Sequence, residues 1–327
     1  MSNLEDRPAE VTCAAGTSPG VQLMAPRDVP LGGPRAMTVR RTLPQRERSL
    51  IGAWCFVDHY GPDDVSDTGG MLVAPHPHTG LQTVSWLFTG EIEHRDSAGH
   101  HAMVRPGEVN LMTAGHGISH SEVSTPQTRS LHGAQLWVAL PDGARDQAPG
   151  FAHHAPTPVT GAGWEARVLL GSLLGDTSPV ATATPLLGAE LLLDPGTTLT
   201  LDVDPTFEHG VLVDRGAVEV AGTRAAPHDL AYVPPGGAAL TLTSYDEPVR
   251  VLLLGGPPFG ESIIMWWNFV GRTHEEIVGF REQWQAQLTD AGPDLRLVDG
   301  RFGIPVGQDL PPIPAPPLPN ARLKERR

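Results

Sequence analysis

Two histidine-containing motifs carry the clearest chemistry in this sequence. His76 and His78 stand in "HPHTG", and His120 and Glu122 stand in "GISHSEV". Side chains at positions i and i+2 of a β-strand point to the same face of the sheet. If the two strands lie close together in one barrel, three imidazoles and one carboxylate converge on a single point.

Such a set of four side chains is suited to a metal ion. Three neutral nitrogens and one carboxylate, without a thiolate, suit iron, manganese, nickel or copper and differ from structural zinc sites. Four protein ligands leave two positions of an octahedron for water, dioxygen or a chelating substrate, which favours catalysis. The alternative is that these are hydrogen-bonded core or surface histidines. Without a cation, however, three inward histidines and a carboxylate are costly to bury.

Composition narrows the class of protein. A chain of 327 residues with 40% hydrophobic content can form a large core and about two domains. The net charge of −14, with Lys324 as the single lysine, argues against direct nucleic-acid binding. The N-terminal sequence has no signal-peptide pattern, and no run approaches the roughly 20 apolar residues that cross a bilayer. With Cys13 and Cys55 as the two cysteines, we expect a cytoplasmic protein.

Short strands are expected over most of the chain. From about residue 38, short apolar runs such as "QTVSWLF" and "GAQLWVAL" alternate with Gly, Pro and Asp turns, which predicts a sandwich or barrel. A second β block follows, in which "GVLVDRGAVEVAG" indicates a hairpin turning at Asp214 to Gly216. That block has no HxH pair, because Glu208 and His209 are adjacent and point to opposite faces. His59, in "FVDHYGP", is interpreted as part of a structural turn, with a gate at the mouth of the pocket as the alternative.

We therefore divide the chain into six parts. They are an irregular N-terminal arm (1–35), a metal-binding β domain (36–145), a linker (146–163), a second β domain without metal (164–272), a helix (273–290) and an extended proline-rich tail (291–327).

The helix has both a start signal and an apolar face. Thr273 and Glu276 form a capping box, and an apolar stripe follows at helical spacing. The tail "GIPVGQDLPPIPAPPLPN" is too rich in proline for a helix or strand and is expected to be extended. It is interpreted as a strap on its own domain, with recruitment of a protein partner as the alternative. The stripe consists of Ile277, Phe280, Trp284 and Leu288.

The sequence from "HPHTG" through "GHGISHSEV", followed by "HGAQLWVALP", closely resembles the first domain of pirins, which are two-domain members of the cupin superfamily. The resemblance continues through "FEHGVLVDRGAVEV", "GESIIMWWNFVGRTHEEI" and "RFGIPVG", over about residues 35–320. It implies an all-β fold of two tandem cupin-type β-barrels, a bicupin, with a C-terminal helix and a proline-rich extended tail.

The same resemblance implies a metal and its ligands. Pirins hold one non-haem iron, which implies one Fe(II) per chain on His76, His78, His120 and Glu122, with Mn, Ni, Cu or Co as substitutes. Gln82 stands where the family usually has glutamate, and Asn110 and Leu111 stand where it usually has Gln and Trp. That glutamate is not an iron ligand in pirins, so metal binding is expected to survive while ligand orientation or substrate fit changes.

Some pirin-like proteins resemble quercetinases, which open the central ring of a flavonol with dioxygen and release carbon monoxide. This implies a flavonol-like substrate, with Glu122 as the base that accepts the 3-hydroxyl proton. The family also contains nonenzymatic, iron-dependent regulators that bind a transcription factor or metabolic enzyme, and this is the alternative function. A purely structural protein with adventitious metal is the third. The expected pocket residues, each of which would otherwise be ordinary core, are Gln82, Val84, Trp86, Phe88, Met112, Gln135 and Trp137.

Overall fold

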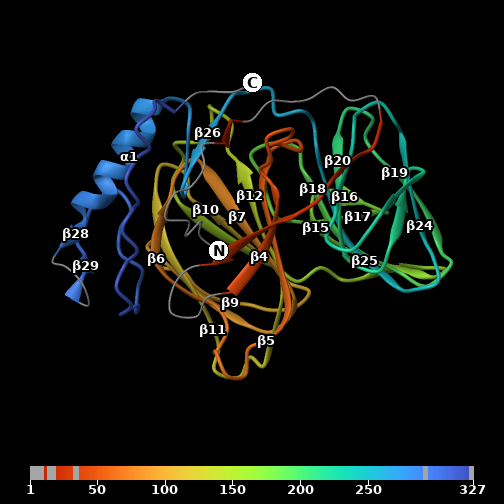
Figure 1. Ribbon diagram of the computed structural model, residues 1–327, viewed down its shortest axis with the longest axis horizontal. Helices are drawn as coiled ribbons and strands as arrows, with labels where there is room; N and C mark the ends of the chain where they lie inside the picture. The colour runs from red at the N-terminus through yellow and green to blue at the C-terminus, as the bar shows by residue number, and fades with distance from the viewer. Residues whose placement is uncertain (1–10, 13–19, 32–36, 290–293, 324–327) are drawn as a thin grey trace.

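The computed structural model describes residues 11–12, 20–31, 37–289 and 294–323. Two β-barrels lie side by side, and one helix packs on the outer flank of the first barrel (Figure 1). This confirms the predicted all-β architecture with a C-terminal helix. Much of the predicted N-terminal arm lies outside the described residues.

The first barrel consists of two sheets. One has seven strands in the order β13-β10-β7-β12-β5-β4-β3, and the other has four in the order β6-β11-β8-β9. The strands are β3 (Arg27–Leu31), β4 (Met37–Leu43), β5 (Trp54–Asp64), β6 (Leu72–His78), β7 (Leu81–Thr89), β8 (Ile92–Asp96), β9 (His101–Val104), β10 (Val109–Thr113), β11 (Ile118–Ser124), β12 (Ser130–Ala139) and β13 (Gly150–His154).

The second barrel repeats this plan. Its sheets have the orders β14-β15-β18-β25-β20-β23-β2 and β19-β24-β21-β22. The strands are β2 (Gln22–Met24), β14 (Val159–Gly161), β15 (Trp164–Leu170), β18 (Leu187–Leu193), β19 (Thr198–Asp202), β20 (Glu208–Arg215), β21 (Val218–Val220), β22 (Thr223–Ala225), β23 (Leu230–Val233), β24 (Ala239–Ser244) and β25 (Val249–Gly256).

The segments outside the two predicted domains complete the barrels. β2, from the N-terminal part of the chain, pairs with β23 of the second barrel. The predicted linker at 146–163 contains two strands: β13 pairs with β10 of the first barrel, and β14 pairs with β15 of the second. The Pro-, Gly- and Ala-rich composition hid these strands, because edge strands need little apolar alternation.

The predicted hairpin at Asp214 to Gly216 is wrong. β20 pairs with β23 and β25, whereas β21 pairs with β22 and β24 in the other sheet. The chain therefore turns a corner of the barrel here, and Gly216 adopts a φ of 73°. Because glycine has no Cβ, it accepts this left-handed conformation without strain.

The helix forms as its capping signal predicts. α1 (His274–Ala286) begins after Thr273, whose side chain accepts a hydrogen bond from the Glu276 backbone N–H. Its buried face consists of Ile277, Phe280 and Trp284. Leu288 lies beyond the helix, in the short strand β28 (Leu288–Thr289), which pairs with β29 (Arg296–Leu297).

The proline-rich tail lies across the helix and the first barrel, as a strap would. The Trp284 indole N–H donates to the Ile313 carbonyl at 2.8 Å. The Ile313 N–H in turn donates to the Pro75 carbonyl of β6, also at 2.8 Å. The tail is thereby attached to the strand that carries "HPH".

The hydrophobic interior is divided between the barrels and their interface. The second barrel is filled by aliphatic side chains such as Leu201 and Leu240. The first barrel has two separate apolar clusters, one around Tyr60 and Val73 and one around Trp137 and Met112. A further cluster joins residues of both barrels.

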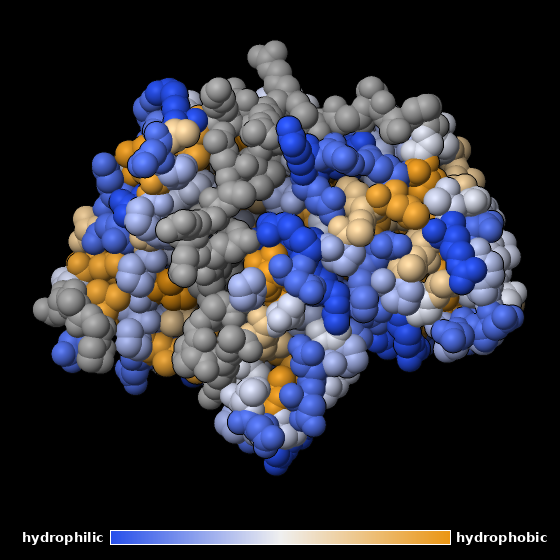
Figure 2. Space-filling model, viewed as in Figure 1, coloured by the Kyte–Doolittle hydropathy of each residue, from blue (hydrophilic) through white to orange (hydrophobic). Residues whose placement is uncertain are grey.

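The outer surface is mainly polar on the face shown in Figure 2. Hydrophilic side chains cover much of the lower projecting lobe, with smaller hydrophobic areas over the second barrel. Among the described residues, the single helix is too short and too polar to span a membrane.

Candidate metal centre

The three predicted histidine ligands are brought together inside the first barrel, where His76, His78 and His120 each have one ligand atom within 4.8 Å of the others, and Glu122 is grouped in the same way with His120. His76 and His78 lie on β6, and His120 and Glu122 lie on the neighbouring antiparallel strand β11. His76 pairs directly with His120, and an irregularity in the register follows before Glu122. The ring centroids are 4.3 Å apart for His76 and His120, and 5.0 Å for each of the other two histidine pairs.

The polar atoms of these rings fit a metal ion. The Nε2 atoms of His76, His78 and His120 are buried and have no hydrogen-bond partner among the described residues. Nδ1 of His76 contacts the Ala74 carbonyl at 2.9 Å, and Nδ1 of His78 contacts the Asn268 carbonyl at 3.0 Å. A carbonyl accepts only from N–H, so Nδ1 carries the proton and Nε2 keeps its lone pair for a cation.

The electrostatics keep these lone pairs available. Burial lowers the pKa of His78 to about 3. Burial and the neighbouring histidines hold the pKa of His76 and of His120 well below the usual range. All three rings are therefore neutral near pH 7, which is the form that binds metals.

Glu122 adds the carboxylate and belongs to a buried polar network. Its side chain is 1% exposed, and the Ser85 hydroxyl lies 3.4 Å from its Oε1. The same hydroxyl donates to Gln135 Oε1 at 2.8 Å. Two neighbouring strands of the large sheet, β7 and β12, thereby reach the carboxylate of β11.

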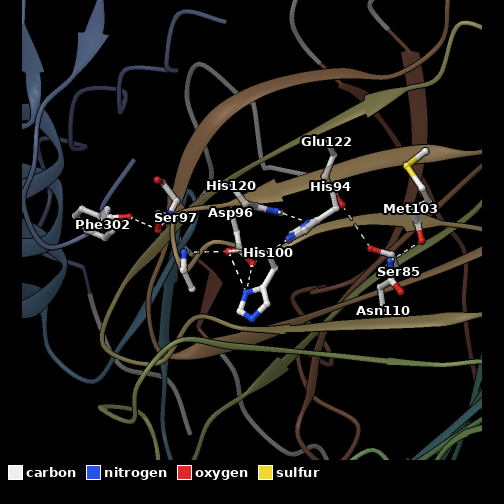
Figure 3. A network of polar contacts seen from close by, with 12 residues as sticks. Ser85, His94, Asp96, Ser97, His100, Met103, Asn110, His120, Glu122 and Phe302 are labelled. Atoms are coloured by element: carbon white, nitrogen blue, oxygen red, sulfur yellow. Dashed lines mark hydrogen bonds and ion pairs between the residues drawn. The ribbon is translucent and has the colours of Figure 1, made fainter. Parts of the chain in front are cut away.

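Residues that the sequence analysis did not single out extend the site away from the three rings (Figure 3). His120 Nδ1 lies 3.4 Å from His94 Nδ1, and His94 Nε2 lies 3.2 Å from Asp96 Oδ2. If His120 donates its Nδ1 proton, His94 accepts it and donates its own proton to Asp96. The carboxylate thus orients His120 through a second imidazole.

The signal for this network was present in the sequence. His94 and Asp96 have the same i, i+2 spacing on β8 that marked the metal motifs. Asp96 also accepts from the backbone N–H groups of Ala98 and His100 and from the His100 ring. His94, His120 and Glu122 also bring one ligand atom each within 4.8 Å of one another. The His94 Nδ1 atom, however, faces His120 Nδ1 and not its Nε2.

The expected pocket residues fall on two different faces. Gln135 contacts Ser85 of the site, the Trp137 ring lies 5.1 Å from the His78 ring, and Met112 packs in the same cluster as Trp137. Val84 and Trp86 instead belong to the core between the barrels, and Phe88 packs against that core.

The expected pocket wall on β7 therefore needs correction. Ser85 reaches the site, so the residues on either side of it point away from the site. Gln82 shares the parity of Val84 and donates to Thr113 Oγ1 at 2.9 Å. Both faces of β7 are buried, and its apolar face packs between the barrels while its polar face meets the metal ligands.

A second histidine cluster joins the two barrels. His59 Nε2 lies 2.7 Å from Asp214 Oδ1, and His132 Nε2 contacts the same oxygen. His59 is thus a buried residue of β5 and does not form a turn. Hydrogen-bond contacts of this length are shorter than the spacing of ligands around a metal, and the Arg250 guanidinium lies 3.3 Å from Asp214 Oδ2. We therefore regard this cluster as a polar contact between barrels.

Comparison with known proteins agrees with this fold. Residues 36–138 match the model of the Pirin family, and residues 188–289 match that of the Pirin C-terminal cupin domain. The chain is therefore a bicupin with a histidine centre in its first barrel. It belongs to the pirin family.

Individual relatives cover nearly all of the chain. A Pseudomonas aeruginosa protein provisionally named quercetin 2,3-dioxygenase is 43% identical over 98% of both chains. A pirin-like protein of Caulobacter vibrioides is 37% identical over 76% of this chain and 88% of its own. The crystal structure of a quercetin 2,3-dioxygenase from Acinetobacter baumannii superposes with a TM-score of 0.83 and 37% identity, over 93% of this chain and 98% of that one.

Proposed function

We propose that this protein is a metal-dependent dioxygenase of quercetin-type flavonols, with one Fe(II) held by His76, His78, His120 and Glu122. The observation that carries the proposal is the convergence of three buried Nε2 atoms without partners in the described structure, beside a buried carboxylate. The names of the Pseudomonas and Acinetobacter relatives support the choice of substrate.

When bound, Fe(II) supplies the Lewis acidity and electron transfer that reaction with dioxygen needs. The three histidines hold their rings in the required tautomer through Nδ1 contacts. In this proposal Glu122 accepts the flavonol 3-hydroxyl proton on a carboxylate oxygen. One flavonol and one dioxygen then give one ring-opened ester and one carbon monoxide.

Ser85, Gln135 and the burial of the site form the environment of that proton transfer. The Ser85 hydroxyl has a single proton and lies within reach of two acceptors, Gln135 Oε1 at 2.8 Å and Glu122 Oε1 at 3.4 Å. The site is enclosed by side chains that are almost fully buried, which restricts water near the transferred proton.

Oxygen uptake is the direct test of this proposal. Protein loaded anaerobically with Fe(II) is mixed with quercetin, and oxygen consumption and carbon monoxide are measured. We expect oxygen uptake by the wild-type protein. In His120→Ala the uptake should be less than about 1% of the wild-type value. His209→Ala is the matched control, because His209 is a buried histidine of the second barrel. No uptake with several flavonols would contradict the proposal and favour the regulatory alternative.

A further inference from the structure

Three more buried polar groups near the metal centre have no hydrogen-bond partner in the described part of the chain. They are the Tyr60 hydroxyl, the Gln135 side-chain Nε2 and the Trp137 indole Nε1. Buried polar atoms are almost always paired in folded proteins, because an unpaired one costs about 1–3 kcal/mol. Three such groups on two adjacent strands therefore require a functional explanation.

All three residues are close to the metal ligands. Tyr60 on β5 is paired with Gly133 of β12, and Gln135 and Trp137 follow on the same face of β12. The Trp137 ring meets the His78 ring at 5.1 Å and 78°. Gln135 is linked to Glu122 through Ser85. β12 also lies beside β7, whose Ser85 completes the link to the carboxylate.

Gly133 packs closely against the Tyr60 hydroxyl. A Cβ at this position would lie 3.0 Å from that hydroxyl oxygen and 2.7 Å from the Trp86 carbonyl oxygen. Any larger residue would press on the hydroxyl. The absence of a side chain at position 133 therefore lets the Tyr60 hydroxyl keep its place inside the barrel.

Each of the three groups is a hydrogen-bond donor. An indole Nε1 and an amide Nε2 only donate. Burial and the nearby Glu122 and Asp58 carboxylates hold the pKa of Tyr60 well above its usual value, so its hydroxyl keeps its proton. The amide oxygen of Gln135 already accepts from Ser85, which fixes the orientation of its NH2 group.

We infer that Tyr60, Gln135 and Trp137 are specificity-determining residues that select ligands with neighbouring oxygen lone pairs, such as planar α-hydroxyketones and their anions. The inference rests on the proposed function only in that the ligand binds at the same metal centre. A divalent cation and one glutamate leave a net charge of +1, which favours a monoanion. Unpaired donors also disfavour ammonium and other N–H-rich ligands, which bring donors of their own.

Binding of two small probes to the Ni(II)-loaded protein without oxygen tests this inference. Maltol, an α-hydroxyketone, presents two oxygen atoms, whereas imidazole binds a metal through nitrogen and offers no oxygen. We expect Tyr60→Phe, Gln135→Leu and Trp137→Phe each to weaken maltol binding by about 10- to 100-fold, since each removes a bond to a charged acceptor. Imidazole binding should change by less than about threefold.

Trp86→Phe is the matched control. Trp86 also has a buried indole N–H without a described partner, but it packs in the core between the barrels. Its substitution removes the same atoms as Trp137→Phe and should leave maltol binding unchanged. Nickel content is measured for every variant, and the unfolding midpoint of Tyr60→Phe without metal should not fall, because no hydrogen bond within the described structure is lost.

The outcomes separate this inference from the proposed function. Equal maltol affinity in the wild type and all three variants, or equal losses for maltol and imidazole, would overturn the inference. Failure of the wild type to bind maltol would overturn it as well. Maltol selectivity in a protein that consumes no oxygen with flavonols would support the donor set and contradict the dioxygenase.

Discussion

The two barrels have the same strand order. They differ in the side chains that their four-stranded sheets direct into the barrel. β6 and β11 of the first barrel correspond in sheet order to β19 and β24 of the second. In the second barrel the buried residues on these strands include four leucines, paired as Leu199 with Leu242 and Leu201 with Leu240. In the first barrel the corresponding strands carry the three histidines and Glu122.

This difference shows that the fold does not determine the site. Each buried leucine stabilises its barrel by roughly 1.5–3 kcal/mol. Buried imidazoles whose Nε2 atoms have no partner in the described structure instead cost free energy until a cation binds them. The second barrel therefore has the interior of a stable scaffold, and the first gives up part of that stability for a site.

The largest expected effect is the loss of metal from one barrel only. His120→Ala removes a converging nitrogen together with the link to His94, so bound metal should fall from about one per chain to below about 0.1. Metal content after dialysis, measured by elemental analysis, checks this. His209→Ala should retain the wild-type content, and retention of metal in His120→Ala would place the ion elsewhere.

The next effect concerns stability, and it should be larger in the second barrel. Leu201→Ala leaves a cavity in an aliphatic core and should lower the free energy of unfolding by about 2–5 kcal/mol. In the metal-free protein, His78→Ala should cost only about 1 kcal/mol, because the change also removes a buried nitrogen without a described partner. Urea titration of both variants gives the two values, and equal losses would contradict the contrast.

Acidification should weaken the contact between the barrels, because it protonates His59 of the first barrel. Burial outweighs the contact with Asp214 and lowers the pKa of His59. Burial opposes ionisation of Asp214, but hydrogen bonds from His132 and His59 outweigh it and hold its pKa well below the usual range. Both groups therefore bind fewer protons in the folded protein than in the unfolded chain.

The sign of the pH effect follows from these directions. His59 makes its full contribution to the free energy of unfolding above pH 6.5, which is its pKa in the unfolded chain. This contribution is lost as the pH falls toward the lower pKa of His59 in the folded protein. The contribution of Asp214 persists above pH 3.8. Between about pH 7 and 5 the free energy of unfolding should fall, by up to about 1.4 kcal/mol per pH unit for His59.

A variant with an amide at position 59 isolates this part of the pH dependence. His59→Gln keeps a donor for Asp214 but does not titrate, so its urea midpoint should fall less steeply with acidification than that of the wild type. His101→Gln is the control, because His101 lies on the surface with its side chain 51% exposed. An unchanged slope in His59→Gln would show that the barrel contact is not pH-sensitive.

The metal centre could be predicted from the sequence because its geometry follows from local periodicity. Alternation places His76 with His78 and His120 with Glu122, and a pleated strand keeps those relations in any fold. The orientation of β7 could not be predicted in this way, because both its faces are buried. Hydrophobic alternation then no longer tells which face meets the site, and the apolar one was wrongly assigned to it.

The cluster between the barrels was out of reach for a different reason. His59, His132 and Asp214 come from three strands of two barrels, and no local pattern relates them. Only the docking of the barrels brings them together. The chain path after Asp214 was missed for a related reason, because an apparent hairpin signal there marks a change of sheet.

The smallest expected effect on the site comes from restoring the family's usual residue at position 82. Gln82 points away from the metal ligands and donates to Thr113, so Gln82→Glu should change metal affinity by less than about twofold. The free energy of unfolding should fall by about 1 kcal/mol, because a buried carboxylate gains only one hydroxyl donor. Metal titration and urea unfolding separate the two effects. A tenfold change in metal affinity would show that the face of β7 that carries Gln82 affects metal binding. The metal site and the core between the barrels would then not be energetically independent.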